Sequence, residues 1–117
     1  MMESNIEKEI VEYQKMEKQL EAVTSQLYQM QAQKQEMENA LELLSKTGDE
    51  VYKAAGSVMV KVDKDSAVKD IKEKLELIDL KLKTMKEQEE ALRNRVQRLT
   101  KKLQEELSHA NSPGEAA

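Results

Sequence analysis

Two long stretches with a heptad pattern, separated by a short valine-rich segment, constrain the fold of this chain most. In each stretch apolar side chains recur about every three or four residues, which places them along one stripe of an α-helix. The first stripe, or seam, consists of Ile6, Ile10, Tyr13, Met16, Leu20, Val23, Leu27, Met30, Met37, Leu41 and Leu44. The second seam consists of Val68, Ile71, Leu75, Ile78, Leu82, Met85, Leu92, Val96, Leu99 and Leu103, with Leu107 continuing it loosely. The pattern predicts two long helices that pair as a coiled coil.

The helix limits follow from capping residues. Ser4 with Glu7 matches a capping box and predicts the first helix start, while Gly48 is a helix stop. For the second helix, Asp63-Lys64-Asp65-Ser66 offers several N-cap candidates, of which we favour Asp65. The predicted segments are a helix over 4–48, a β-hairpin over 49–63, a helix over 65–108 and a flexible tail over 109–117, together forming one domain.

One polar residue interrupts each seam. Because the two seams have similar spans, a single hairpin between them predicts antiparallel pairing. In the register that matches the seam ends, Lys34 lies opposite Leu82 and Glu89 lies opposite Leu27. We therefore expect Lys34 and Glu89 to specify the register without pairing with each other.

The pattern of the segment between the seams predicts β-structure. Val58, Val60 and Val62 alternate with other residues, the pattern of a half-buried strand, and Gly56 stands where the chain must turn after a short strand at 51–53. A lone two-stranded hairpin is marginally stable and leaves open edges. We therefore predict that the chain oligomerises through this element. The expected assembly residues are Val51, Tyr52, Gly56, Val58, Val60 and Val62.

Composition narrows the function classes. With 36% charged and 3% aromatic residues in 117, the chain lacks the bulky side chains of a globular core. It has no cysteine and a single histidine, His109, so the sequence offers no Cys or second His as a metal co-ligand, and we expect no metal and no cofactor. The carboxylates are spread over helix faces instead of converging in a pocket, so we expect no enzymatic activity. No apolar run is long enough to span a membrane. A cytoplasmic protein is the expectation.

A basic run near the end of the second seam is a candidate nucleic-acid site. It contains Arg93, Arg95, Arg98, Lys101 and Lys102, and Glu105 and Glu106 follow at once. The net charge of the chain is −4, and aromatic stacking partners are absent from the run. We interpret the run as a solvated flank of the coiled coil, with no binding to nucleic acid or membrane.

The central segment and the heptads on both sides of it resemble a known protein family. Glu50-Val51-Tyr52-Lys53, Gly56, Val60-Lys61 and Lys64-Asp65, together with the Leu/Lys/Glu heptads, resemble the β subunit of archaeal prefoldins, and more weakly the eukaryotic subunit 6 type. The resemblance implies a hexamer of two α and four β subunits whose hairpins form a β-barrel body. It also implies an ATP-independent chaperone that holds unfolded chains at its coiled-coil tips and passes them to a group II chaperonin.

At the helix ends far from the hairpin, here called the tips, the two seams do not match. Ile6 has no large apolar partner in the expected register, and a three-residue slip between Ile10 and Met16 has no counterpart in the second seam. We therefore expect incomplete burial there and predict client contact by Met1, Met2, Ile6, Ile10, Leu103 and Leu107. A structural coiled-coil spacer or adaptor that binds no client is the alternative function, and self-association is the alternative to assembly with α subunits.

Overall fold

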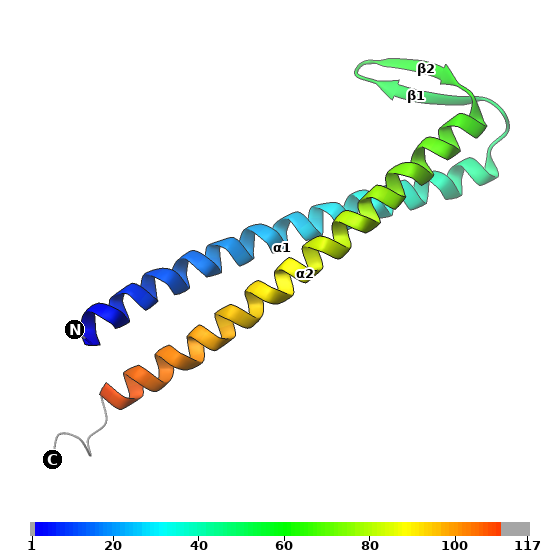
Figure 1. The fold of residues 1–117 in the computed structure, drawn as a ribbon. Coiled ribbons are helices and arrows are strands. Elements are labelled where there is room, and N and C mark those ends of the chain that lie inside the picture. The colour runs from blue at the N-terminus through cyan, green and yellow to red at the C-terminus, as the bar shows by residue number, and fades with distance from the viewer. Residues whose placement is uncertain (1, 111–117) are drawn as a thin grey trace. The chain divides into compact units, whose positions relative to one another are not determined.

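Two long helices joined by a β-hairpin make up the structure (Figure 1). The computed structural model describes the backbone of residues 2–110 and the side chains of residues 5–109. In chain order the elements are α1 (Met2–Lys46), β1 (Val51–Ala55), β2 (Val58–Val62) and α2 (Lys64–Ala110). The predicted mainly α fold with one hairpin is confirmed.

The chain divides into two compact units, which are described separately. The hairpin unit spans Leu27–Thr84, and the end unit combines the residues up to Gln26 with those from Met85 onward. In the end unit Glu9 contacts Lys102, whereas Thr24 contacts Glu89. Rising numbers on α1 thus meet falling numbers on α2, which makes the pairing antiparallel. The hairpin unit is antiparallel as well, because Lys34 meets Asp79 and Thr47 meets Lys64.

The predicted seams form the helix contacts within each unit. Among the described residues, every seam member except Leu107 is buried or half-buried, including the two polar ones. Leu27 and Leu82 of the hairpin unit are 6% and 5% exposed, and Leu103 of the end unit is 7% exposed. Most other seam residues keep part of their surface in water, as expected when a side chain is covered by a single partner helix.

The helix boundaries differ from the prediction by one or two residues, and both predicted caps are wrong. α1 begins at Met2, so Ser4 lies inside the helix, and it ends at Lys46 rather than 48. The N-cap of α2 is Asp63, because its Oδ2 accepts hydrogen bonds from the Ser66 backbone N (3.0 Å) and Oγ (3.1 Å). β2 ends at Val62 and α2 begins at Lys64, so the N-cap stands two residues before the favoured Asp65.

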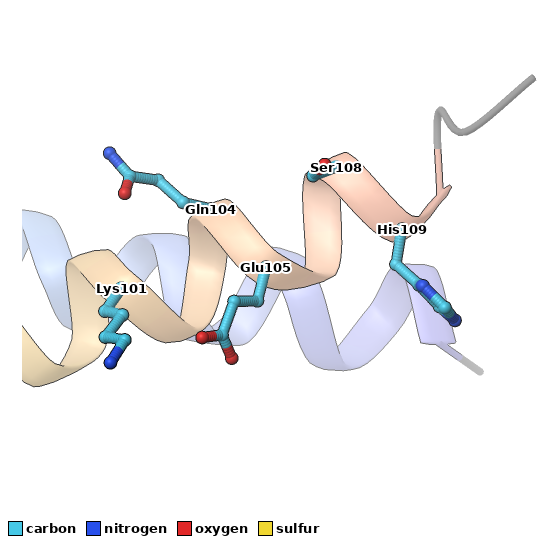
Figure 2. A pocket seen from close by; sticks show the side chains of 5 residues that line it. All are labelled: Lys101, Gln104, Glu105, Ser108 and His109. Carbon is cyan, nitrogen blue, oxygen red and sulfur yellow. The ribbon is translucent and has the colours of Figure 1, made fainter.

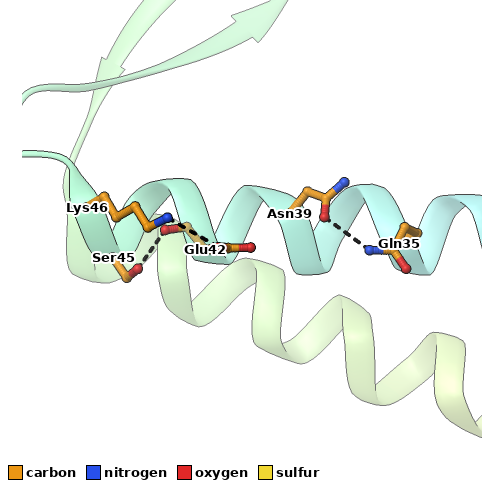
Figure 3. A network of polar contacts seen from close by, with 5 residues as sticks. All are labelled: Gln35, Asn39, Glu42, Ser45 and Lys46. Carbon is orange, nitrogen blue, oxygen red and sulfur yellow. Dashed lines mark hydrogen bonds and ion pairs between the residues drawn. The ribbon is translucent and has the colours of Figure 1, made fainter.

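The solvent-facing side of α1 carries polar contacts within the helix (Figure 3). Gln35 donates to Asn39 at 3.0 Å, and Lys46 pairs with Glu42 at 3.2 Å, both at the i, i+4 spacing. Such pairs add only tenths of a kcal/mol each to helix stability, roughly 0.2–0.5. They support the last turns of α1 beside the hairpin without taking part in the seam.

A two-residue turn closes the hairpin. β1 and β2 pair antiparallel with Ala55 opposite Val58, which leaves Gly56 and Ser57 as the connection. Gly56 has φ of +63°, while among the described residues other than glycine none has a positive φ. A positive φ at the first turn position alone is the signature of a type II′ turn, whose twist matches that of paired strands. The glycine is therefore required by the backbone at this position.

Candidate functional site

The hairpin has a valine-rich face that is exposed in the single chain. Cross-strand partners share a face, and Val58, Val60 and Val62 stand opposite Ala55, Lys53 and Val51. Val58 and Val60 are 58% and 47% exposed. Of the six residues predicted for assembly, the structure places Val51, Val58, Val60 and Val62 on this valine face. Tyr52 lies on the opposite face and Gly56 in the turn.

An apolar groove lies between β1 and the helix ends of the hairpin unit. Its volume is about 510 Å³, and Leu43, Leu44, Val51, Tyr52, Ala67 and Ile71 are among the residues that line it. Leu43 falls off the seam and keeps 65% of its surface exposed. Val62 of β2 also lines the groove, so the groove joins apolar surface of the helix ends to both strands of the hairpin.

The residues predicted for client contact are not equally accessible. Leu107 is 43% exposed, and Ile6 and Ile10 are half-buried. Leu103 is only 7% exposed, so the expectation of incomplete burial was wrong for this residue, whose side chain is covered by the paired helices of the end unit. Met1 and the side chain of Met2 lie outside the described part of the chain.

One exposed apolar residue of the end unit was not predicted from the sequence. Val11 is 63% exposed although it directly follows the seam residue Ile10. A valine at a position where the heptad calls for a polar residue is the signal that could have identified it. Among the described residues of this unit, Val11 and Leu107 are thus the exposed large apolar side chains.

A small cavity of about 360 Å³ lies between the helices of the end unit. Its lining includes Ile6, Glu9, Lys102 and Glu106, and Lys102 Nζ lies 2.7 Å from Glu9 Oε1. The hydrogen bond from Lys102, and after it the neighbouring Glu106 side chain, lowers the pKa of Glu9, while Glu9 raises the pKa of Glu106. Glu9 in turn raises the pKa of Lys102. The cavity therefore places the apolar side chain of Ile6 beside three charged groups that shift one another's pKa values.

Another shallow depression lies on the last turns of α2 (Figure 2). Lys101, Gln104, Glu105, Ser108 and His109 line it, and all five side chains come from this one helix. Gln104 and Ser108 are uncharged, and in the described part of the chain no second element lines the depression. The depression has neither the depth nor the chemistry of a catalytic pocket.

Both polar seam residues have partners on the other helix. Lys34 Nζ lies 2.7 Å from Asp79 Oδ1, and Asp79 raises the pKa of Lys34. Glu89 Oε2 accepts a hydrogen bond from Thr24 Oγ1 at 3.3 Å. The expected register placed both residues opposite leucines and gave neither a polar partner. A lysine stem is long enough to reach a flanking position one turn from the facing seam residue, which explains the Asp79 contact.

Searches for metal and membrane features concern the described residues alone. There, no three His, Cys, Asp or Glu side chains are grouped as metal ligands. Within the same residues no helix is long and apolar enough to cross a membrane.

Comparison with known proteins agrees with this architecture. The family model described as "Prefoldin subunit" matches residues 7–110. The chain belongs to the prefoldin subunit family. The prefoldin subunit beta of Archaeoglobus fulgidus is 41% identical over 101 residues, covering 85% of this chain and 87% of that protein. That of Methanothrix thermoacetophila is 33% identical over 104 residues, covering 87% of each.

A solved structure supports the fold. The crystal structure of the prefoldin beta subunit from Thermococcus strain KS-1 matches with a TM-score of 0.77 at 28% identity, covering 93% of this chain and 94% of that one. The prefoldin family is one of non-enzymatic chaperones, so this chain is not an enzyme. Family membership also implies oligomeric assembly with other prefoldin subunits.

Proposed function

We propose that this prefoldin subunit captures unfolded proteins with the apolar side chains of its helix ends and delivers them to a group II chaperonin without ATP. The contact residues are Met1, Met2, Ile6, Ile10, Leu103 and Leu107, to which we add Val11. In this proposal four such subunits join two α subunits in a cytoplasmic hexamer. Assembly uses the hairpin, through Val51, Tyr52, Gly56, Val58, Val60 and Val62.

The exposed apolar side chains of the end unit carry the client-binding proposal. Val11 and Leu107 are 63% and 43% exposed on helices that are otherwise charged, and Ile6 and Ile10 are half-buried beside them. Covering a partly exposed aliphatic side chain contributes on the order of 1 kcal/mol. One such contact is weak, but several subunits in one assembly act together through effective concentration. Weak and repeated contacts suit a protein that must hold many sequences and release them.

A structural spacer or adaptor that binds no client is the second candidate. The burial of Leu103 favours it, because a closed helix pair offers less apolar surface to a client. The two candidates differ in what the helix-end side chains do, and only the first requires these side chains to contact other proteins.

The deciding experiment changes the helix ends and leaves the hairpin untouched. The triple variant Ile6→Ser, Ile10→Ser and Leu107→Ser should keep its oligomeric mass and helicity yet lose most suppression of aggregation of a denatured test protein. Tyr28→Ser is the matched control, because Tyr28 is 70% exposed but lies in the hairpin unit. Full protection by the triple variant would exclude the helix ends as the client site and favour the spacer.

A further inference from the structure

The cavity of the end unit places two carboxyl groups against each other. Glu9 Oε2 and Glu106 Oε2 are both buried, and neither accepts a hydrogen bond from a donor group among the described residues. The two side chains line the same cavity, and each shifts the pKa of the other. Two carboxylate oxygens cannot form a hydrogen bond unless one of them carries a proton, and buried acceptors without a donor are costly.

Among the residues that the structure describes, the surrounding charges do not neutralise both carboxylates. On α1 the neighbouring charged groups are Lys8, which lines the cavity, and Glu12, which acts on Lys102. On α2 they are Lys102 and Glu106. In the described part of the chain, Lys102 is the one cation within ion-pair distance of either carboxylate, and it pairs with Glu9 Oε1. One cation thus faces two acids, which leaves the second acid to bind a proton.

We propose that Glu9 and Glu106 share one proton across the two helices, so that the helix ends close in mildly acidic solution and separate as the pH rises. With the proton present, Glu106 donates to Glu9 and Lys102 balances the remaining charge. Without it, two negative carboxylates share the cavity, and one oxygen of each is buried. Separation of the helices then lets water solvate both groups.

The direction of the pH effect follows from the two pKa shifts. The pKa of Glu106 is raised in the closed form, so its stabilising contribution is complete at low pH and is lost as the pH rises through that raised value. The pKa of Glu9 is lowered, so its contribution is lost as the pH falls through that lowered value. Closure is therefore strongest between these two pKa values and weakens above the higher one.

Opening would change the apolar surface that the helix ends present. Ile6 lines the same cavity, and Leu103, which is 7% exposed, lies one residue from Lys102. Separation would make both available to water or to a client. The effect on clients rests on the proposed function, whereas the pH-dependent pairing of the helices does not.

The absence of cysteine makes the pairing directly measurable. Spin labels attached at Val11→Cys and Gln104→Cys, both exposed positions of the end unit, report the separation of the two helices. Labelled chain diluted into excess unlabelled chain avoids signals between subunits. Between pH 5 and pH 8 we expect the population with a long interlabel distance to increase by at least about twofold. An unchanged distance distribution over this range would overturn the proposal.

Two variants separate the shared proton from general charge effects. Glu106→Gln carries a permanent donor, so its distance distribution should stay in the closed form at both pH values. Glu105→Gln removes the same charge from an exposed neighbouring position and should keep the pH response of the parent. A pH response in Glu106→Gln equal to that of the parent would also overturn the proposal. Because this readout is independent of clients, it separates failure of the switch from failure of the proposed function.

Discussion

Each polar residue in a seam replaces an apolar contact with a polar contact to the facing helix. Lys34 shows this most clearly, because its side chain is 36% exposed and pairs with Asp79, which is 53% exposed. Exposed ion pairs contribute little to stability, since water competes for both charges. The pair is better suited to choosing a register than to holding the helices together.

Replacing Lys34 by leucine tests this at the residue scale. Lys34→Leu should raise the melting temperature by about 2 °C or more at equal protein concentration, because it completes the apolar seam while Asp79 remains hydrated. Thermal unfolding followed by circular dichroism measures the change. Lys81→Leu, at an exposed position of α2, is the control and should have little effect. A lower melting temperature for Lys34→Leu would mean that the Asp79 pair outweighs the apolar gain.

At the scale of elements, the start of α2 depends on one carboxylate. Asp63 accepts hydrogen bonds from the backbone N and the side chain of Ser66. These bonds satisfy an otherwise unpaired donor of the first turn and fix where the hairpin ends and the helix begins.

Removal of this cap should therefore destabilise the protein. Asp63→Ala should lower the free energy of unfolding by about 1 kcal/mol, as measured by urea denaturation. Asp65→Ala, which removes an acid of the first turn without a capping bond, should cost less, about 0.5 kcal/mol. If Asp65→Ala had the larger effect, Asp65 rather than Asp63 would be the functional cap.

The seams were predictable from sequence because a heptad fixes which helix face is buried. The sequence does not distinguish Asp63 from Asp65 as the N-cap of α2, since each stands within a few residues of the helix start and capping depends on local backbone angles. Nor could it give the partners of Lys34 and Glu89, because long side chains reach beyond the facing layer. In the candidate functional site, the sequence predicts the hairpin turn at Gly56. It does not predict the exposure of Val11 or the burial of Leu103, because both depend on how closely the helices approach.

At the scale of the whole molecule, few of the described side chains are fully buried within the single chain. The hairpin unit exposes Leu43, Leu77 and Leu80 as well as the valine face of the hairpin. A two-stranded ribbon is marginal alone, so association through the hairpin would supply contacts that the single chain lacks.

A charge on the valine face tests assembly at this scale. Val60→Asp should dissociate the oligomer while helicity is retained, because a carboxylate cannot be buried without a partner. Light scattering after size-exclusion chromatography measures the mass. Met59→Asp places the same charge on the opposite face of β2 and should dissociate the oligomer less. An unchanged mass for Val60→Asp would show that the hairpin does not drive assembly.

The two-residue turn at Gly56 also affects how the chain folds. A hairpin this tight forms in microseconds, and its strands bring the end of α1 and the start of α2 together, where Lys64 Nζ donates to the Thr47 carbonyl at 2.8 Å. The entropy of closing a long loop is then largely avoided when the first seam residues meet. Within residues 27–84, helix pairing should therefore nucleate beside the hairpin and propagate away from it.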